Sequence, residues 1–208
     1  METNKGYILV ADDIPDILAL LDTTLKFKGY RVLTARNGLE AYEMIQKERP
    51  ALLVTDILMP KMDGFSLVHR LRLDPNTRNL PVIFLSATYV APEDKAFALT
   101  IGATRFLEKP IALQEFLPVI EELLAKPTSP TVPLSREDFY TGYRKRLDIK
   151  LAEKNTQIIR AEGLLKSVSE HEKESFTFSL HQAINERKEI LRLLDEINVR
   201  LANRDSNT

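Results

Sequence analysis

Five short apolar runs rich in β-branched residues recur along the first 125 residues, and this repetition constrains the fold more than any other feature. The runs lie at 7–11, 31–35, 52–55, 82–85 and 104–107. Longer stretches with apolar residues at helical spacing follow them, at 17–25, 39–45, 65–71, 97–101 and 113–124. Strands that are apolar throughout belong in a parallel sheet covered by helices on both faces. Right-handed crossovers then predict a doubly wound α/β fold with a five-stranded parallel sheet.

Polar residues follow four of the five predicted strands directly. Asp12 and Asp13 follow the first run, Asp56 follows the third, Ser86 follows the fourth, and the fifth leads to Lys109. Because ligands bind at the carboxyl ends of the strands in such a sheet, we expect these side chains to meet at one edge.

Three carboxylates in a partly desolvated cleft repel one another, so the cluster predicts a bound divalent cation. The sequence has no cysteine, and oxygen ligands without Cys or His favour Mg2+. Lys109 beside a metal needs an anion between the two, and a phosphoryl group fits, with one hydrogen bond from Ser86. Asp56 is then the nucleophile whose carboxylate becomes an acyl phosphate.

Residues 6–125 resemble the receiver domain of two-component response regulators, the CheY-like superfamily. Five motifs carry the resemblance: Val10-Ala11-Asp12-Asp13, the segment 55–64 (TDILMPKMDG), Ser86-Ala87, Gly102-Ala103 and the segment 106–110 (FLEKP). The resemblance implies a flavodoxin-like strand order, Mg2+ as the metal, and a phosphoryl group taken from a sensor histidine kinase or phosphotransfer protein.

The family roles carry over to the matching positions of this sequence. Asp56 resembles the phosphoacceptor and Asp13 a direct metal ligand, while Asp12 resembles an acidic helper that often acts through water. The backbone carbonyl of Leu58 is implied as a third protein ligand of the metal. Leu58 itself is apolar, so it lacks the hydrogen-bonding side chain that helps to hold an attacking water, and this predicts slow loss of the phosphoryl group.

The resemblance also implies a switch. Ser86 and Lys109 would contact the phosphoryl group, and Phe106 matches the family's aromatic switch residue, which turns inward when the hydroxyl residue moves toward the phosphate. Phosphorylation would thereby remodel the face formed by the fourth helix, fifth strand and fifth helix. The bond between Lys109 and Pro110 matches one that the family usually holds cis.

Simpler interpretations stay open at single positions. An Asp-Asp pair is common in turns, and Asp13 also fits an N-cap of a helix beginning near Pro15. Phe106 alone is most often a core aromatic. A receiver that never accepts phosphate would normally have lost Asp13, Asp56 or Lys109, but all three are present.

Charge and hydropathy set limits on partners and location. The chain has 29 basic and 30 acidic residues, so its net charge of -1 creates no overall field for nucleic acid or a membrane surface. No apolar run approaches the length of a membrane span, and the start of the chain does not resemble a signal peptide. We expect a cytoplasmic signalling protein without membrane contact, and not an enzyme.

The predicted domains are a receiver at 1–126, a proline-rich linker at 127–134, a helical coiled-coil region at 135–203 and a polar tail at 204–208. Ser135 and Asp138 resemble the acidic form of a capping box at the start of the helical region. From 135 to 202 the chain has no proline and is crowded with charged residues and leucine, which predicts a long α-helical extension.

Two apolar seams run through this region. The first contains Tyr140, Leu147, Leu151, Ile158, Ala161, Leu165 and Val168, and the second contains Phe176, Leu180, Ala183, Ile190, Leu194, Ile197 and Leu201. Arg144 and Lys154 interrupt the first seam, and the phase shifts at 169–175. We expect a parallel homodimeric coiled-coil stalk, with an intramolecular helical hairpin as the alternative.

Two other outputs deserve comparison with the stalk. The segments 161–165, 172–176 and 183–185 are similar in order to the ANTAR family of three-helix RNA-binding antiterminators, although the family's glycine-containing turn is missing. Its basic residues would be Arg187, Lys188, Arg192, Arg200 and Arg204, which are interleaved with acidic residues as on a solvated helix face.

Helical histidines at 69, 171 and 181 suggest phosphotransfer, but the sequence that follows a kinase phosphohistidine is absent, so surface positions are expected.

Overall fold

The computed structural model describes residues 6–126, 132–166 and 170–202, without the side chains of 170–172, 174 and 175. The chain divides into two compact units, Met1–Leu134 and Ser135–Thr208. Most of the predicted linker, at 127–131, and the predicted tail at 204–208 lie outside the described residues, so both stay predictions.

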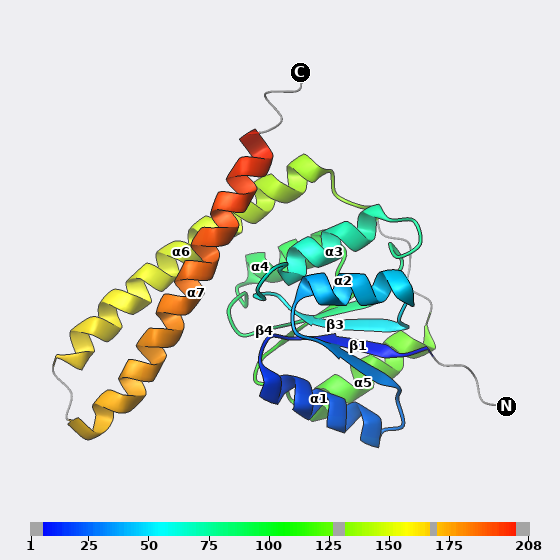
Figure 1. The fold of residues 1–208 in the computed structure, drawn as a ribbon, viewed down its shortest axis with the longest axis horizontal. Helices are drawn as coiled ribbons and strands as arrows, with labels where there is room; N and C mark the ends of the chain where they lie inside the picture. The colour runs from blue at the N-terminus through cyan, green and yellow to red at the C-terminus, as the bar shows by residue number, and fades with distance from the viewer. Residues whose placement is uncertain (1–5, 127–131, 167–169, 203–208) are drawn as a thin grey trace. The chain divides into compact units, whose positions relative to one another are not determined.

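The first unit is an α/β sandwich built on a parallel sheet (Figure 1). Its strands are β1 (Ile8–Ala11), β2 (Val32–Ala35), β3 (Leu52–Asp56), β4 (Val82–Ser86) and β5 (Arg105–Glu108), in the order β2-β1-β3-β4-β5. One face carries α1 (Pro15–Phe27) and α5 (Leu113–Ala125), and the other carries α2 (Gly38–Lys47), α3 (Gly64–Leu73) and α4 (Pro92–Thr100). This arrangement confirms the predicted flavodoxin-like, doubly wound fold.

The core explains why the strands are apolar throughout. On one face of the sheet, side chains of β1, β3 and β4 pack against those of α1 and α5, and the buried members of this cluster include Val10, Val54, Leu21, Leu25, Phe116 and Ile120. Burying both faces of each central strand removes a large apolar area from water, which drives the two helical layers onto the sheet.

Strand register places the predicted site. Ala11 of β1 lies opposite Thr55 of β3, so the next residues, Asp12 and Asp56, come side by side at the carboxyl edge. On the other side of β3, Asp56 lies opposite Leu85, which precedes Ser86.

Arg72 on α3 is the largest fully buried side chain of the described residues, at 2% exposure. Its guanidinium donates hydrogen bonds to the carbonyls of Gly102, Leu80 and Thr77, which belong to the turns before β5 and β4. Burial lowers the pKa of Arg72 to about 10, which still leaves it charged at neutral pH. Three turn carbonyls are thereby satisfied by one side chain.

The second unit is a pair of long helices, α6 (Arg136–Leu165) and α7 (Glu170–Ala202), which lie side by side (Figure 1). The contacts run in opposite directions: Arg200 donates to the Tyr140 hydroxyl, and Lys154 pairs with Glu186. The helices are therefore antiparallel. The continuous helix expected for a parallel stalk is wrong, and the chain has the hairpin alternative.

The start of the hairpin and part of its apolar seams follow from the sequence, although Phe139, Tyr143 and Lys150 are also buried and belong to neither predicted seam. The Ser135 hydroxyl accepts a hydrogen bond from the Asp138 amide and donates one to the Asp138 carboxylate, as the predicted cap requires. Buried seam residues are Leu147, Ile158, Ala183, Ile190, Leu194 and Ile197. The described residues of this unit form two helices, so they give no support to the three-helix arrangement that the ANTAR resemblance implied.

The histidines differ in their surroundings. His69 on α3 is buried, contrary to the expected surface position, and its Nε2 lies 3.2 Å from the carbonyl oxygen of Leu134. His181 is exposed, whereas the side chain of His171 lies outside the described residues. No described helix combines the length and apolar character needed to cross a membrane.

Candidate functional site

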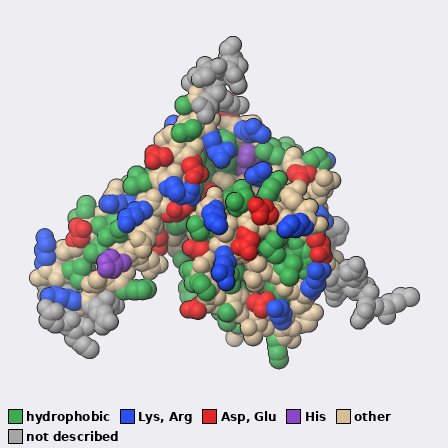
Figure 2. Space-filling model, viewed as in Figure 1, with side chains coloured by type: hydrophobic (Ala, Val, Ile, Leu, Met, Phe, Trp, Pro, Cys, Tyr) green, Lys and Arg blue, Asp and Glu red, His purple; other side chains and the backbone are tan. Residues whose placement is uncertain are grey.

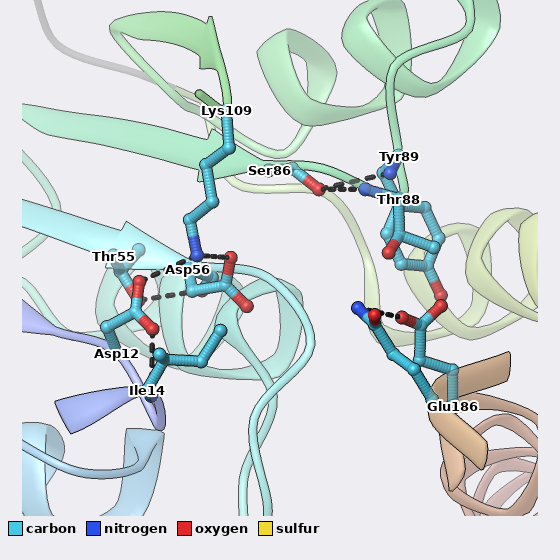
Figure 3. Close-up of polar contacts among 10 residues, drawn as sticks. Asp12, Ile14, Thr55, Asp56, Ser86, Thr88, Tyr89, Lys109 and Glu186 are labelled. Carbon is cyan, nitrogen blue, oxygen red and sulfur yellow. Dashed lines mark hydrogen bonds and ion pairs between the residues drawn. The ribbon is translucent and has the colours of Figure 1, made fainter. Parts of the chain in front are cut away.

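Two aspartates and one lysine meet at the carboxyl edge of the sheet (Figure 3). Lys109 Nζ lies 2.7 Å from Asp12 Oδ2 and 2.7 Å from Asp56 Oδ1. Their side chains are nearly inaccessible, at 10%, 1% and 9% exposure respectively. Lys109 is 97 residues from Asp12 and 53 residues from Asp56 in the sequence, so the fold of the chain brings them into contact. The structure thus brings together three of the predicted site residues.

Burial and charge act on this cluster in opposite directions. The pKa of Asp56 is raised to about 7: burial raises it most, the charges of Asp12 and Asp13 also raise it, and Lys109 lowers it. Burial alone would lower the pKa of Lys109, but the carboxylates of Asp56 and Asp12 outweigh it and raise the pKa. The ammonium is therefore charged, and it holds two carboxylates together that would otherwise repel.

Asp12 and Asp13 have different surroundings. Asp12 is buried, and its Oδ1 accepts a hydrogen bond from the amide of Ile14, which is the N-cap residue of α1. The side chain of Asp13 is exposed beside the cluster and contributes its negative charge to the pKa of Asp56. Asp13 therefore does not cap α1 in the way considered from sequence, since no side chain caps that helix.

Ser86 ends β4 with its side chain turned into the following loop (Figure 3). Its hydroxyl oxygen accepts hydrogen bonds from the amides of Thr88, at 3.2 Å, and Tyr89, at 3.0 Å. Ser86 thus fixes the start of the loop between β4 and α4.

Phe106 on β5 is half-buried and lines a cavity of about 360 Å³ together with Pro110, Ile111 and Phe116. The peptide bond between Lys109 and Pro110 is cis, as the resemblance implied. The aromatic ring therefore borders an open space beside the end of β5, directly before Lys109.

Sequence reasoning missed the part that Gly64 plays at the site. A Cβ on Gly64 would lie 2.2 Å from the carbonyl oxygen of Asp56, so only glycine permits α3 to begin this close to the end of β3. Asp63 caps α3 by accepting a hydrogen bond from the amide of Ser66. The Asp-Gly pair entered the sequence analysis only as part of the receiver motif at 55–64, and nothing local in the sequence indicates this close approach.

The residues present fit Mg2+ by the chemistry of their donor atoms. Asp12, Asp13 and Asp56 supply carboxylate oxygens, and Leu58 supplies a nearby backbone carbonyl two residues after Asp56. In the described part of the chain, no three His, Cys, Asp or Glu side chains form a converged metal cage. Mg2+ commonly binds through one or two carboxylates, waters and substrate phosphate rather than through such a cage, so the donor set suits it.

Comparison with known proteins identifies the family of the first unit. The sequence profile described as "Response regulator receiver domain" matches residues 8–121. The chain is 36% identical over 175 residues to "Probable transcriptional regulator ycf27" of Cyanophora paradoxa, covering 82% of this chain and 71% of that protein. It is 30% identical to "Probable transcriptional regulatory protein TcrX" of Mycobacterium tuberculosis, covering 85% of this chain and 71% of that protein.

Solved structures match the first unit. The chemotaxis response regulator CheY4 of Vibrio cholerae aligns with a TM-score of 0.54 at 32% identity, over 58% of this chain and 99% of that chain. The receiver domain of the sensor histidine kinase PA1611 of Pseudomonas aeruginosa aligns with a TM-score of 0.54 at 26% identity, over 58% of this chain and 98% of that chain. That structure holds a magnesium ion coordinated in its active site cleft. With its parallel sheet, acidic edge and matched profile, this chain belongs to the response regulator receiver domain family.

Proposed function

We propose that the chain is a phosphorylation-dependent response regulator that accepts a phosphoryl group on Asp56 from a sensor histidine kinase or phosphotransfer protein. The observation that carries this proposal is the buried carboxylate of Asp56, 2.7 Å from the Lys109 ammonium and beside Asp12. The chain would act as a signalling switch in the cytoplasm and not as an enzyme with a separate substrate.

In the proposed transfer, an Asp56 carboxylate oxygen attacks the phosphorus of a phosphohistidine. The new P–O bond forms as the P–N bond breaks, and the bond's electron pair returns to the imidazole of the donor. The attack requires ionised Asp56. Lys109 supports this state by its charge, and it would then exchange a carboxylate partner for a phosphoryl oxygen.

Asp12, Asp13, Asp56 and the Leu58 carbonyl would hold Mg2+. When bound, the metal would supply positive charge that neutralises the oxygens of the transferring phosphoryl group. Asp12 is already held by the Ile14 amide and by Lys109, which fits a role through water better than direct ligation. The side chain of Asp13 is exposed beside the cluster, which fits the direct ligand role that the family resemblance implies.

Ser86 and Phe106 would form the switch. The Ser86 hydroxyl is bound to two amides of the loop after β4, so turning it toward a phosphoryl group would release that loop. Phe106 borders a cavity, so its ring has space for a second position. Both changes fall on the face formed by α4, β5 and α5, where a two-state readout would lie.

The hairpin of α6 and α7 would be the output region. We also propose self-association through it. Because the apolar seams already face each other within one chain, a homodimer would pair one hairpin with another. RNA binding is not favoured, since two helices stand where three are needed, and positive and negative side chains are interspersed on the face seen in Figure 2.

The test is phosphorylation of the full chain with acetyl phosphate and Mg2+, read by phosphate-affinity gel electrophoresis. We expect one phosphoryl group per chain, loss of the shifted band in Asp56→Asn and in EDTA, and a normal band in Asp22→Asn, a surface control on α1. A band of equal intensity in Asp56→Asn would overturn the proposal. Light scattering of the full chain, with and without Mg2+ and beryllofluoride, then tests whether the phosphorylated state changes the oligomer.

A further inference from the structure

Both seams of the hairpin are interrupted by a cation. Lys154 occupies the same heptad position of α6 as Leu147 and Ala161, and Arg187 occupies the same heptad position of α7 as Leu180 and Leu194. A polar residue at a seam position lowers stability but specifies register and the number of strands. The interruptions at Lys154 and Arg187 therefore call for a structural reason.

The antiparallel pairing gives Lys154 a partner. Its Nζ lies 2.6 Å from Glu186 Oε2, and the two side chains are only 15% and 18% exposed. The contact is an ion pair rather than an aligned hydrogen bond, because that oxygen has no hydrogen-bond partner among the described residues. Apolar seam residues lie on both sides along the helices, with Ile158 following Lys154 and Ile190 following Glu186. The pair thus sits within the apolar seam.

A parallel dimer built from the same seams would bring like charges together instead of an ion pair. Identical seam residues face each other in register, so Lys154 would meet Lys154 of the second copy, and Arg187 would meet Arg187. Glu186, 32 positions further along, would lie about 48 Å away from either lysine at 1.5 Å per residue. The parallel form would bury like charges without a counter-charge, whereas the hairpin pairs Lys154 with a carboxylate.

We propose that Lys154, Glu186 and Arg187 form a polar layer that selects the intrachain antiparallel hairpin and excludes a parallel coiled coil of two chains. The apolar seam residues supply the packing energy in either arrangement. The polar layer decides between them because only the hairpin places a carboxylate, that of Glu186, beside Lys154, and because it keeps each Arg187 apart from a second Arg187. This assignment concerns the second unit alone and does not depend on phosphorylation of Asp56.

Engineered disulfides separate the two arrangements, and the absence of cysteine gives a clean background. In the full chain, Tyr140→Cys with Arg200→Cys reports the hairpin, because these side chains touch across α6 and α7. Ala161→Cys in a separate chain reports the parallel dimer, in which two copies of residue 161 would face each other. Initial rates of disulfide formation under mild oxidation, read on non-reducing gels, measure each arrangement.

The polar layer is then varied in both reporter backgrounds. Lys154→Glu or Glu186→Lys alone should slow formation of the intrachain 140–200 disulfide about fivefold, and the double reversal should restore it, as expected for a directly coupled pair. Lys154→Leu with Arg187→Leu should produce interchain 161–161 disulfides that the parent chain lacks. Lys188→Glu, a reversal at an exposed position of α7, is the matched control and should change neither rate.

Two results would overturn the assignment. One is a double reversal whose 140–200 rate is no faster than that of the slower single variant. The other is a leucine variant that forms the intrachain disulfide as fast as the parent and no interchain disulfide. The reversals conserve every apolar residue of the seam, and the leucine variant adds apolar area. The helical content of each variant, measured by circular dichroism, must match the parent before its rate is compared, so that unfolding does not imitate either result.

Discussion

Lys109 Nζ lies 2.7 Å from Asp56 Oδ1 at the carboxyl edge of the sheet, with almost no access to water. The same ammonium contacts Asp12 at 2.7 Å, so one positive charge serves two buried carboxylates. A buried site with an excess of negative charge is poised to take a cation, and its charge balance depends on pH.

Asp56→Asn should make the metal-free protein less sensitive to alkaline pH. The folded pKa of Asp56, about 7, lies above the ordinary value of 3.8, so the folded state binds this proton more tightly than the unfolded state. The stabilisation of the folded state by this proton is complete below the unfolded pKa of Asp56, and it is lost as the pH rises through the folded pKa. Between pH 5 and 8 we expect the parent to lose on the order of 2 kcal/mol that Asp56→Asn does not lose.

Denaturant unfolding at both pH values in EDTA measures this difference, with Asp22→Asn as a control. Asp22 forms an ion pair with Lys26 on the surface of α1, so its removal should leave the pH dependence unchanged. If the unfolding free energies of the parent and Asp56→Asn depend equally on pH, the pKa of Asp56 is not raised in the folded protein. Mg2+ should stabilise the parent at pH 8, because it binds the ionised form.

Lys109→Met should destabilise the protein strongly at neutral pH. The substitution leaves Asp12 and Asp56 adjacent, buried and without a counter-charge, which costs about 3–5 kcal/mol. Part of the loss should return on acidification, as one carboxylate takes up a proton. Lys95→Met is the matched control: Lys95 pairs with Glu108 at the surface, where an ion pair contributes at most about 1 kcal/mol. Similar losses of unfolding free energy in both variants would refute the prediction.

Arg72→Met should be among the most destabilising substitutions outside the site. It leaves the carbonyls of Gly102, Leu80 and Thr77 without the buried guanidinium, and we expect a loss of about 3–5 kcal/mol in unfolding free energy. Arg70→Met, two residues away on α3, removes only a contact over the Tyr42 ring and should cost about 1 kcal/mol or less. Thermal or denaturant unfolding of both variants checks the contrast.

Gly102→Ala and Gly29→Ala should differ although both glycines have positive φ. A Cβ on Gly29 meets open space, so the cost is the backbone strain of about 1–2 kcal/mol. A Cβ on Gly102 would lie 2.6 Å from Arg72 Nε, so the guanidinium must move away from the carbonyls it binds. A larger loss of stability in Gly102→Ala than in Gly29→Ala, and its reduction to about the Gly29→Ala loss in an Arg72→Met background, would identify the clash as the cause of the difference.

The sequence predicts the sheet and its acidic edge well, because both depend on local patterns. Apolar runs place the strands, and the residue after each run must lie at the carboxyl edge, so Asp12, Asp56 and Lys109 are found from spacing alone. Arg72 could not be found in this way. Within an alternating Leu-Arg-Leu pattern it resembles a surface residue, and only the packing of α3 against two distant turns buries it.

The hairpin shows a second limit. Heptad seams such as the one through Leu147 and Ile158 fit a parallel dimer and an antiparallel pair equally well, because both bury the same stripe. The deciding contact, between Lys154 and Glu186, joins residues 32 positions apart. No local pattern indicates it, so the sequence alone favoured the wrong arrangement.

Leu58→Gln should shorten the lifetime of phosphorylated Asp56. The position lies two residues after the acceptor and is half-buried at the edge of the site, so a polar side chain there can hold a water in line with the acyl phosphate. General-base assistance and orientation of this kind contribute about 10- to 100-fold, so we expect the decay rate after removal of acetyl phosphate to rise by at least about tenfold. Leu58→Met keeps the position apolar with similar volume and should leave the rate unchanged. The decay is followed on phosphate-affinity gels after rapid desalting into Mg2+ buffer. Equal decay in the parent and Leu58→Gln would show that water reaches the phosphoryl group without help from this position, and the expected long lifetime of the parent would then lose its physical basis.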